Sequence, residues 1–169
     1  RRFEALSYFD VSDDFNLITV GRREAYSSTY QHILDDMLGK LKASGKTLEQ
    51  VLSPKQMARM DVFLEAAAVG NRMNDVVQLI SPAKAAEVVQ QLGQKAASSK
   101  DMRHVDIMLS MLSAPGCTRE VRNLLEREIK AQYDHAKLRH DKTAEDRFGL
   151  MAYAYATNPP EGALQLGHH

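Results

Sequence analysis

The sequence has few of the features that mark particular classes of protein. It contains one cysteine, Cys117, so no internal disulfide can form. Nothing therefore indicates an oxidising compartment, and we expect a cytoplasmic location. Lysine plus arginine and aspartate plus glutamate both total 22, so the net charge gives no argument for nucleic acid or an anionic membrane as the main partner. No apolar run approaches about 20 residues, so we expect no membrane span.

Local catalytic and cofactor-binding motifs are also absent. The glycines occur singly, and neither GxGxxG nor GxxxxGK[ST] is present. There is no Gly-x-Ser-x-Gly nucleophile elbow and no Glu-x-x-His pair typical of a di-iron helical bundle. We therefore expect no cofactor and no metal, and the sequence does not favour an enzyme.

Three similar junctions do stand out between residues 51 and 116. Two apolar residues precede Ser53-Pro54 and Ser81-Pro82, and a looser version occurs at Ser113-Ala114-Pro115. Serine is a good helix N-cap, and proline suits the first helical position. Each junction therefore predicts that one helix ends and another begins. Their spacing of about 30 residues is typical of helical-hairpin repeats.

Elsewhere, apolar residues recur at three- and four-residue intervals, as on one face of a helix. Further helices are predicted over 22–44, 54–69, 72–80, 101–112 and 119–140; another begins at Pro82 with Gly93 near its end, and a last one follows Thr143. Thr118 and Thr143 are the expected N-caps of the last two helices. The predicted fold is all-α, with about seven helices stacked as antiparallel helical hairpins in a short α-solenoid-like arrangement or an irregular bundle. The apolar run over 15–20 is too short for a periodicity, and we expect it to be extended.

These elements predict one main domain. Residues 1–21 are expected to form an N-terminal arm or linker. Residues 22–158 form a single helical domain with the hairpin repeats at 51–116. Residues 159–169 are expected to be a tail, whose final Gly-His-His is interpreted as the start of an expression tag.

Few polar residues form a recognisable chemical group. Cys117 precedes a predicted helix, where a thiol pKa can be lowered, but no base can be placed beside it, and a small semi-buried turn residue is the preferred interpretation. His135 and His140 are five residues apart, which turns the two rings about 140° away from each other on a helix. That spacing does not suit a metal site.

The first functional hypothesis is a non-catalytic adaptor or scaffold module that binds a partner peptide or subunit within a larger assembly. Methionine fills irregular cores, but it also lines adaptable peptide-binding grooves, and tyrosine is enriched at interfaces. The oligomeric state is not predicted. The candidate partner-binding residues are Met57, Met60, Met73, Met108, Met111, Tyr153 and Tyr155.

Two other hypotheses remain open. A nucleic-acid-associated domain would use the basic side of residues 119–147, although the interleaved acidic residues favour a face that pairs with itself. Alternatively, a small helical enzyme or effector would use dispersed residues such as His104, Glu128 and His135. The residues of the nucleic-acid hypothesis are Arg119, Arg122, Lys130, Lys137 and Arg139.

Overall fold

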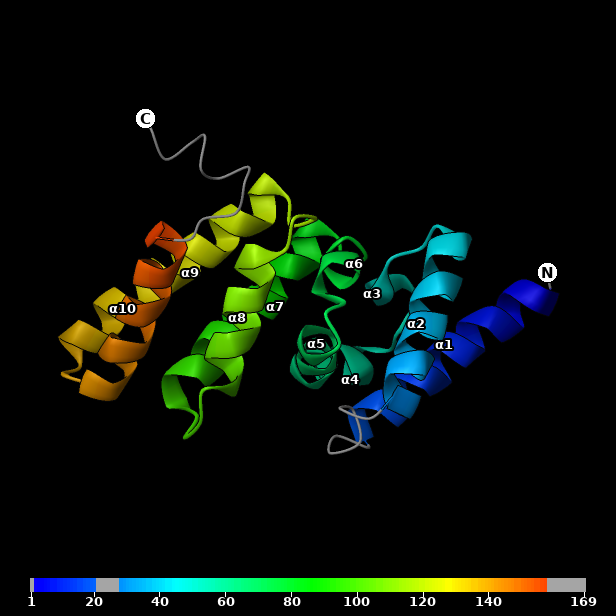
Figure 1. The fold of residues 1–169 in the computed structure, drawn as a ribbon, viewed down its shortest axis with the longest axis horizontal. Coiled ribbons are helices and arrows are strands. Elements are labelled where there is room, and N and C mark those ends of the chain that lie inside the picture. Colours follow the sequence, from blue (N-terminus) through cyan, green and yellow to red (C-terminus); the bar gives the residue numbers. More distant parts are fainter. Residues whose placement is uncertain (1, 21–27, 158–169) are drawn as a thin grey trace. The chain divides into compact units, whose positions relative to one another are not determined.

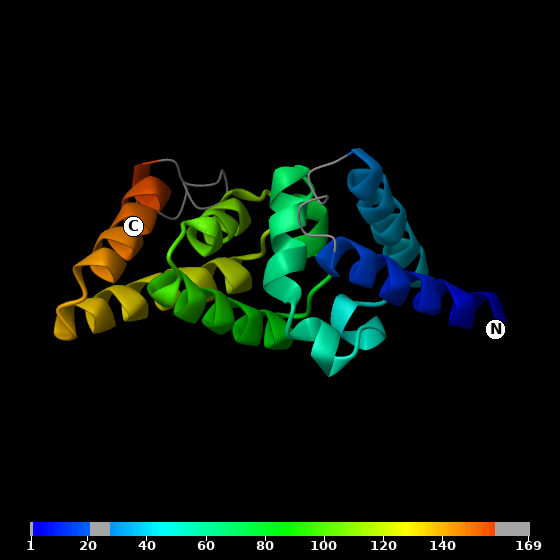
Figure 2. The same ribbon diagram turned by 90° about the horizontal axis from the view of Figure 1, so that it is seen from below.

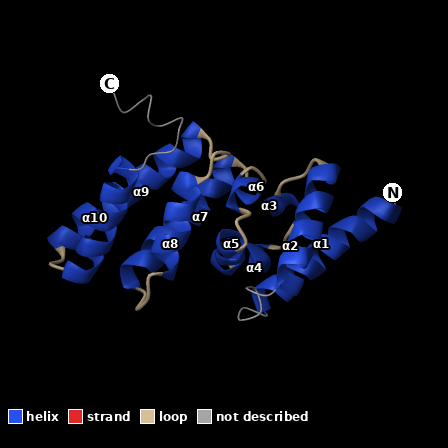
Figure 3. Cartoon of the chain, viewed as in Figure 1, coloured by secondary structure: helices blue, strands red, loops and turns tan. Residues whose placement is uncertain are grey.

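A computed structural model describes residues 2–20 and 28–157, with side chains described over 11–20 and 28–154. Within these ranges every regular element is a helix (Figures 1 and 3). None of these helices is both long and apolar enough to cross a membrane. The ten helices are α1 (Arg2–Val20), α2 (Ser28–Ser44), α3 (Leu48–Val51), α4 (Pro54–Met57), α5 (Met60–Val69), α6 (Met73–Val77), α7 (Pro82–Ser98), α8 (Arg103–Ser113), α9 (Arg119–Leu138) and α10 (Lys142–Thr157).

The all-α prediction is confirmed, but the expected number of about seven helices is wrong for the described residues. The expected extended segment over 15–20 is also wrong, because α1 continues through it. Val11, Phe15 and Ile18 are buried at steps of four and three, so they share one face of a helix. The acidic pair Asp13-Asp14 lies within this helix, and Asp14 forms an ion pair with Lys40 of α2 at 3.6 Å.

The chain forms two compact units, Arg1–Ser81 and Pro82–His169. In unit 1, α1 packs against α2, α3 and α5. The rings of Phe15 in α1 and Phe63 in α5 lie 5.0 Å apart between centroids and are both fully buried. The predicted domain boundary at residue 21 and the predicted tail at 159–169 lie outside the described residues.

The first Ser-Pro junction forms the predicted helix start. The Ser53 hydroxyl accepts a hydrogen bond from the Gln56 backbone N–H at 3.2 Å, and the Gln56 side chain accepts one from the Ser53 N–H at 2.9 Å. This reciprocal pair is a capping box. The helix predicted over 54–69 is nevertheless divided, because α4 ends at Met57 and α5 begins at Met60.

The three junctions are not equivalent, so the predicted stacked-hairpin arrangement is not supported. Pro54 begins a helix of four residues, whereas Pro82 begins one of 17 residues. At the third junction α8 ends at Ser113, as predicted, but Ser113 does not cap a following helix, since its hydroxyl donates to the Leu109 carbonyl at 2.9 Å. The next helix begins at Arg119, with Thr118 as the predicted N-cap.

In unit 2, α9 packs against both α7 and α10, and two perpendicular views show α10 beside α9 (Figures 1 and 2). Gly93 lies at the contact between α7 and α9. A Cβ at this position would come within 2.2 Å of the Glu128 Oε2. We expected Gly93 near a helix end, but α7 continues to Ser98, so this glycine permits close packing instead.

The turn between α9 and α10 supplies hydrogen-bond partners to backbone groups at the end of α9 and at the start of α10. His140 has a left-handed φ of 57°, and the Asp141 N–H donates to the Ala136 carbonyl at 2.9 Å, as in a Schellman motif. The Asp141 carboxylate accepts from the Ala144 N–H at 3.1 Å. Asp141 therefore caps α10, and the prediction of Thr143 as the N-cap is wrong.

A buried arginine joins α10 to the end of α7. The Arg147 side chain is 9% exposed, and its Nη1 donates to the carbonyl of Ala96 at 2.9 Å and to that of Ser99. These carbonyls lie at the C-terminal end of α7, where the helix leaves acceptors without intrahelical partners and carries partial negative charge. The contact therefore gives these carbonyls a hydrogen-bond donor, and their partial negative charge stabilises the buried guanidinium.

The two serines of the first and third junctions differ in their effect on stability. We expect Ser53→Ala to lower the free energy of unfolding by about 1 kcal/mol, because an N-cap is lost. Ser113→Ala should change it by less than about 0.5 kcal/mol, since Ser113 is exposed and ends its helix. Urea denaturation followed by circular dichroism measures both. Equal losses would remove the assignment of Ser53 as the cap.

Arg147 provides a second test. Arg147→Met leaves two acceptors at the end of α7 without a donor, so we expect a loss of about 1–3 kcal/mol in unfolding free energy. The control is Arg127→Met, because Arg127 is exposed and bonds only the Asn123 carbonyl of its own helix. Its effect should stay within about 0.5 kcal/mol. Denaturation curves of the two variants that coincide would contradict the role of Arg147.

Candidate protein-binding site

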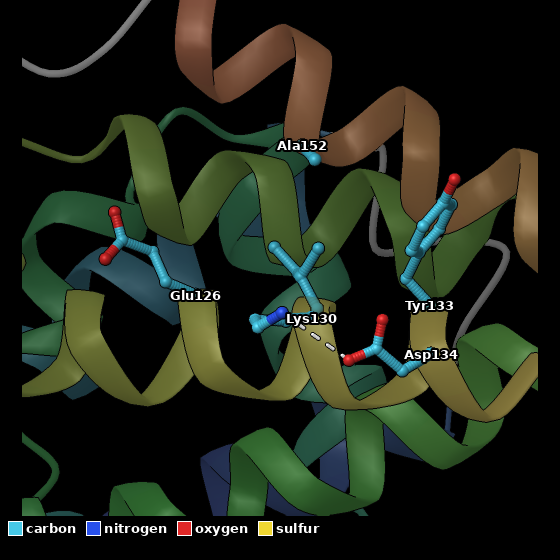
Figure 4. A pocket seen from close by; sticks show the side chains of 6 residues that line it. Glu126, Lys130, Tyr133, Asp134 and Ala152 are labelled. Carbon is cyan, nitrogen blue, oxygen red and sulfur yellow. Dashed lines mark ion pairs between the residues drawn. The ribbon is translucent and has the colours of Figure 1, made fainter.

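An open cavity of about 350 Å³ lies between α9 and α10 (Figure 4). In α9, the buried residues Val121, Leu125 and Ile129 follow one another at steps of four. The same step places Glu126, Lys130 and Asp134 along the neighbouring edge of the helix. The cavity is lined by Glu126, Ile129, Lys130, Tyr133 and Asp134 of α9 and by Ala152 of α10.

The side of the cavity formed by α10 is open because a small residue lies there. Phe148 and Met151 are fully buried, whereas Ala152 is exposed and reaches only a short distance toward α9. Figure 4 shows Tyr133 rising from α9 toward α10, on the same side as Ala152. The result is an apolar hollow of side-chain size, with polar groups confined to the α9 edge.

The charged residues along this edge differ in whether they have an ion-pair partner. Lys130 forms an ion pair with Asp134 at 3.5 Å, which leaves Glu126 with no ion pair among the residues that the structure describes. One uncompensated carboxylate therefore lies beside the apolar hollow. Farther along α9, the Lys137 ammonium lies 5.3 Å from the centre of the Tyr133 ring, a cation–π contact that favours the observed position of the ring.

The predicted methionines lie elsewhere. All five are buried, with exposed fractions of 8% or less. Three belong to unit 1 and two to unit 2, and each contributes to the core of its unit. Tyr153 is 68% exposed on α10, together with Leu150 at 50%. Tyr155 lies in α10, but its side chain is outside the described set. The methionines are Met57, Met60, Met73, Met108 and Met111.

The residues of the nucleic-acid hypothesis all lie in α9 or at its C-cap. Arg119 is exposed and Arg122 is half-buried. Lys130 and Lys137 have the contacts described above. Arg139 pairs with Asp141 at 3.3 Å and contacts the His135 Nδ1 at 2.7 Å. Three of these five cations are therefore engaged with neighbours in the chain.

The residues of the enzyme hypothesis lie in different surroundings. His104 is buried in α8, whereas His135 is exposed on α9. Glu128 accepts a hydrogen bond from Gln132, one turn away, at 2.8 Å. Within the described part of the chain, no group of three or more His, Cys, Asp or Glu side chains is arranged to hold a metal ion.

Cys117 is buried, with 3% of its surface exposed. Burial disfavours the thiolate and raises the pKa of the thiol to about 11, and the nearby Arg122 guanidinium only partly offsets this effect. The hypothesis of a lowered pKa at a helix N-terminus is therefore wrong, because desolvation outweighs any favourable field. The preferred interpretation, a small semi-buried turn residue, agrees with an unreactive thiol, although Cys117 is more deeply buried than expected.

The described residues form an all-helical protein with an open, largely apolar cavity between α9 and α10. Comparisons with known proteins add no assignment, since no protein-family model, no curated protein and no solved structure matches the chain. The sequence predicted the helix over 119–140 that carries Ile129 and Tyr133, but not the cavity that they line. It gave no signal for Ala152, because its role depends on which helix lies opposite.

The state of Cys117 can be measured directly. Since the pKa is raised from 9.0 to about 11, the native thiol stays protonated at pH 8. We expect it to react with Ellman's reagent at least about a hundredfold more slowly than in the urea-unfolded chain, as two pKa units imply. Rapid stoichiometric labelling of the folded protein would contradict its burial.

Proposed function

We propose that this protein is a non-catalytic interaction module whose α9–α10 cavity receives an apolar side chain from a partner peptide. The observation that carries the proposal is an open hollow of about 350 Å³ between two helices, with Ile129, Tyr133 and Ala152 in its lining. Grooves between helices commonly bind a partner through one or a few apolar anchors.

The size of the hollow supports a side-chain anchor. Ligand pockets in proteins span roughly 300–1,000 Å³, so this one lies at the small end. Such a volume suits one bulky side chain better than an extended cofactor. Burial of an aliphatic or aromatic side chain is worth about 1.5–3 kcal/mol, which is enough to localise a peptide while additional contacts supply the remaining affinity.

The charge beside the hollow supports a specific partner chemistry. Glu126 has no ion pair in the described part of the chain, whereas Lys130 is already paired with Asp134. A peptide with lysine or arginine close to its apolar anchor would compensate the Glu126 carboxylate. Charge complementarity of this kind contributes mainly to specificity and to the rate of association. An acidic peptide would instead meet an uncompensated carboxylate.

Filling the cavity should abolish this binding. We expect Ala152→Trp to eliminate binding, because an indole at an exposed position of α10 occupies the space of the anchor. Ala131→Trp is the matched control, since Ala131 is exposed on α9 but does not line the cavity. A displayed peptide library selected on the native protein, with counter-selection on Ala152→Trp, should yield peptides that combine an apolar residue with a nearby basic residue.

The binding of a selected peptide is then measured by fluorescence anisotropy with each variant. Ala152→Trp should weaken it at least tenfold, whereas Ala131→Trp should bind like the native protein. Peptides that are enriched but bind both variants equally would overturn this site. Light scattering tests for self-association. If the native protein self-associates and Ala152→Trp does not, the occupant of the cavity is a second copy of the chain and not a partner peptide.

A further inference from the structure

A second cavity lies in unit 1 and differs in chemistry from the first. Its volume is about 430 Å³. None of the described residues that line it is acidic, and each has a polar or positively charged side chain. They are Ser12 and Asn16 of α1, and Ser53, Lys55, Gln56 and Arg59 at and around α4.

The wall of this cavity is fixed by a buried amide. Gln56 is 9% exposed. Its Nε2 donates to the Ser12 carbonyl at 3.1 Å and to the Asn16 Oδ1 at 3.0 Å, while its Oε1 accepts from the Ser53 N–H. The Ser53 hydroxyl accepts from the Gln56 N–H at 3.2 Å, so its own proton remains able to donate to a ligand. Gln56 therefore holds α1 and α4 around the cavity.

Neither cation of the cavity pairs with an acidic residue in the described part of the chain. In the described part of the chain, Lys55 has neither an ion pair nor a hydrogen bond. The Arg59 guanidinium donates one hydrogen bond, from Nη2 to the Thr19 carbonyl at 2.7 Å, and its other N–H groups have no acceptor among the described residues.

Other cations of the same unit behave differently. Lys40 pairs with Asp36 at 2.8 Å, and Lys42 pairs with Asp75 at 2.7 Å. Arg72 forms a two-pronged ion pair with Asp35. The absence of acidic partners at Lys55 and Arg59 is therefore a local property of the polar cavity, although the chain as a whole has no net charge.

We propose that this cavity binds a phosphate group, either as inorganic phosphate or as part of a small phosphorylated molecule. A guanidinium and an ammonium are the side chains best suited to phosphate oxygens, and neutral donors such as Ser53 add orientation. The absence of a carboxylate from the described lining favours an anion over a cation. A volume of about 430 Å³ leaves room for a small organic group attached to the phosphate.

The experiment uses the full chain in a phosphate-free buffer of low ionic strength. Inorganic phosphate and glycerol phosphate are titrated separately, and amide chemical shifts and calorimetry report binding. We expect saturable binding with the largest shifts at Ser12, Ser53 and Gln56. Lys55→Gln should weaken it at least tenfold. Lys100→Gln, which removes the same charge from an exposed site in unit 2, should leave it within twofold.

Comparison of the two probes identifies the source of the phosphate group. Equal affinities support recognition of the phosphate group alone, whereas tighter glycerol phosphate binding supports a phosphorylated small molecule. Absence of saturable binding of either probe up to about 10 mM would overturn the proposal. Equal weakening by Lys55→Gln and Lys100→Gln would overturn it as well, because it would show nonspecific attraction of anions.

Discussion

Each helix leaves up to four N–H groups at its start and four C=O groups at its end without an intrahelical partner. This constraint is severe here, because three of the ten described helices have only four or five residues. Side chains and turns satisfy many of these ends, and several of them also join two elements. Gln56 completes a capping box and holds α1, Arg147 joins α10 to the end of α7, and Asp141 belongs to the turn after α9 and caps α10. The helix ends therefore help to determine which helices pack together.

Whether a charged side chain has a partner within the chain also separates the structural surface from the proposed binding sites. Along α9, most charged residues are engaged within the chain, as with Lys130 and Asp134. Glu126 is an exception, and it lies beside an apolar cavity that a small residue, Ala152, leaves open. In unit 1, Lys55 and Arg59 lie in a polar cavity and have no acidic partner among the described residues. Both proposals arise where the interactions within the folded chain are incomplete, and they invoke different chemistry: an apolar anchor with a basic neighbour at one cavity, and a phosphate group at the other.

Only some of the local hydrogen-bonding patterns were predictable, since Asp141 rather than Thr143 caps α10. Ser53 and Thr118 are N-caps as expected, and α2 ends before Gly45, whose φ of 71° suits glycine. Other predictions failed because the sequence pattern was short or was compatible with more than one structure. The repeated Ser-Pro pairs indicated equivalent hairpins, but the helices that they begin differ in length. The apolar run over 15–20 was too short to indicate a helix, although Phe15 and Ile18 belong to one buried face of α1.

The sequence by itself determined the helical class, several helix ends and the lack of local catalytic motifs, because each depends on residues that are close along the chain. Only the tertiary structure decided that the five candidate methionines are buried and that Cys117 is desolvated enough to keep its proton. It also decided where the two cavities lie and which cations lack partners. These properties depend on burial and on contacts between residues far apart along the chain, such as Gln56 and Ser12, which are separated by 44 positions, and no local pattern encodes them.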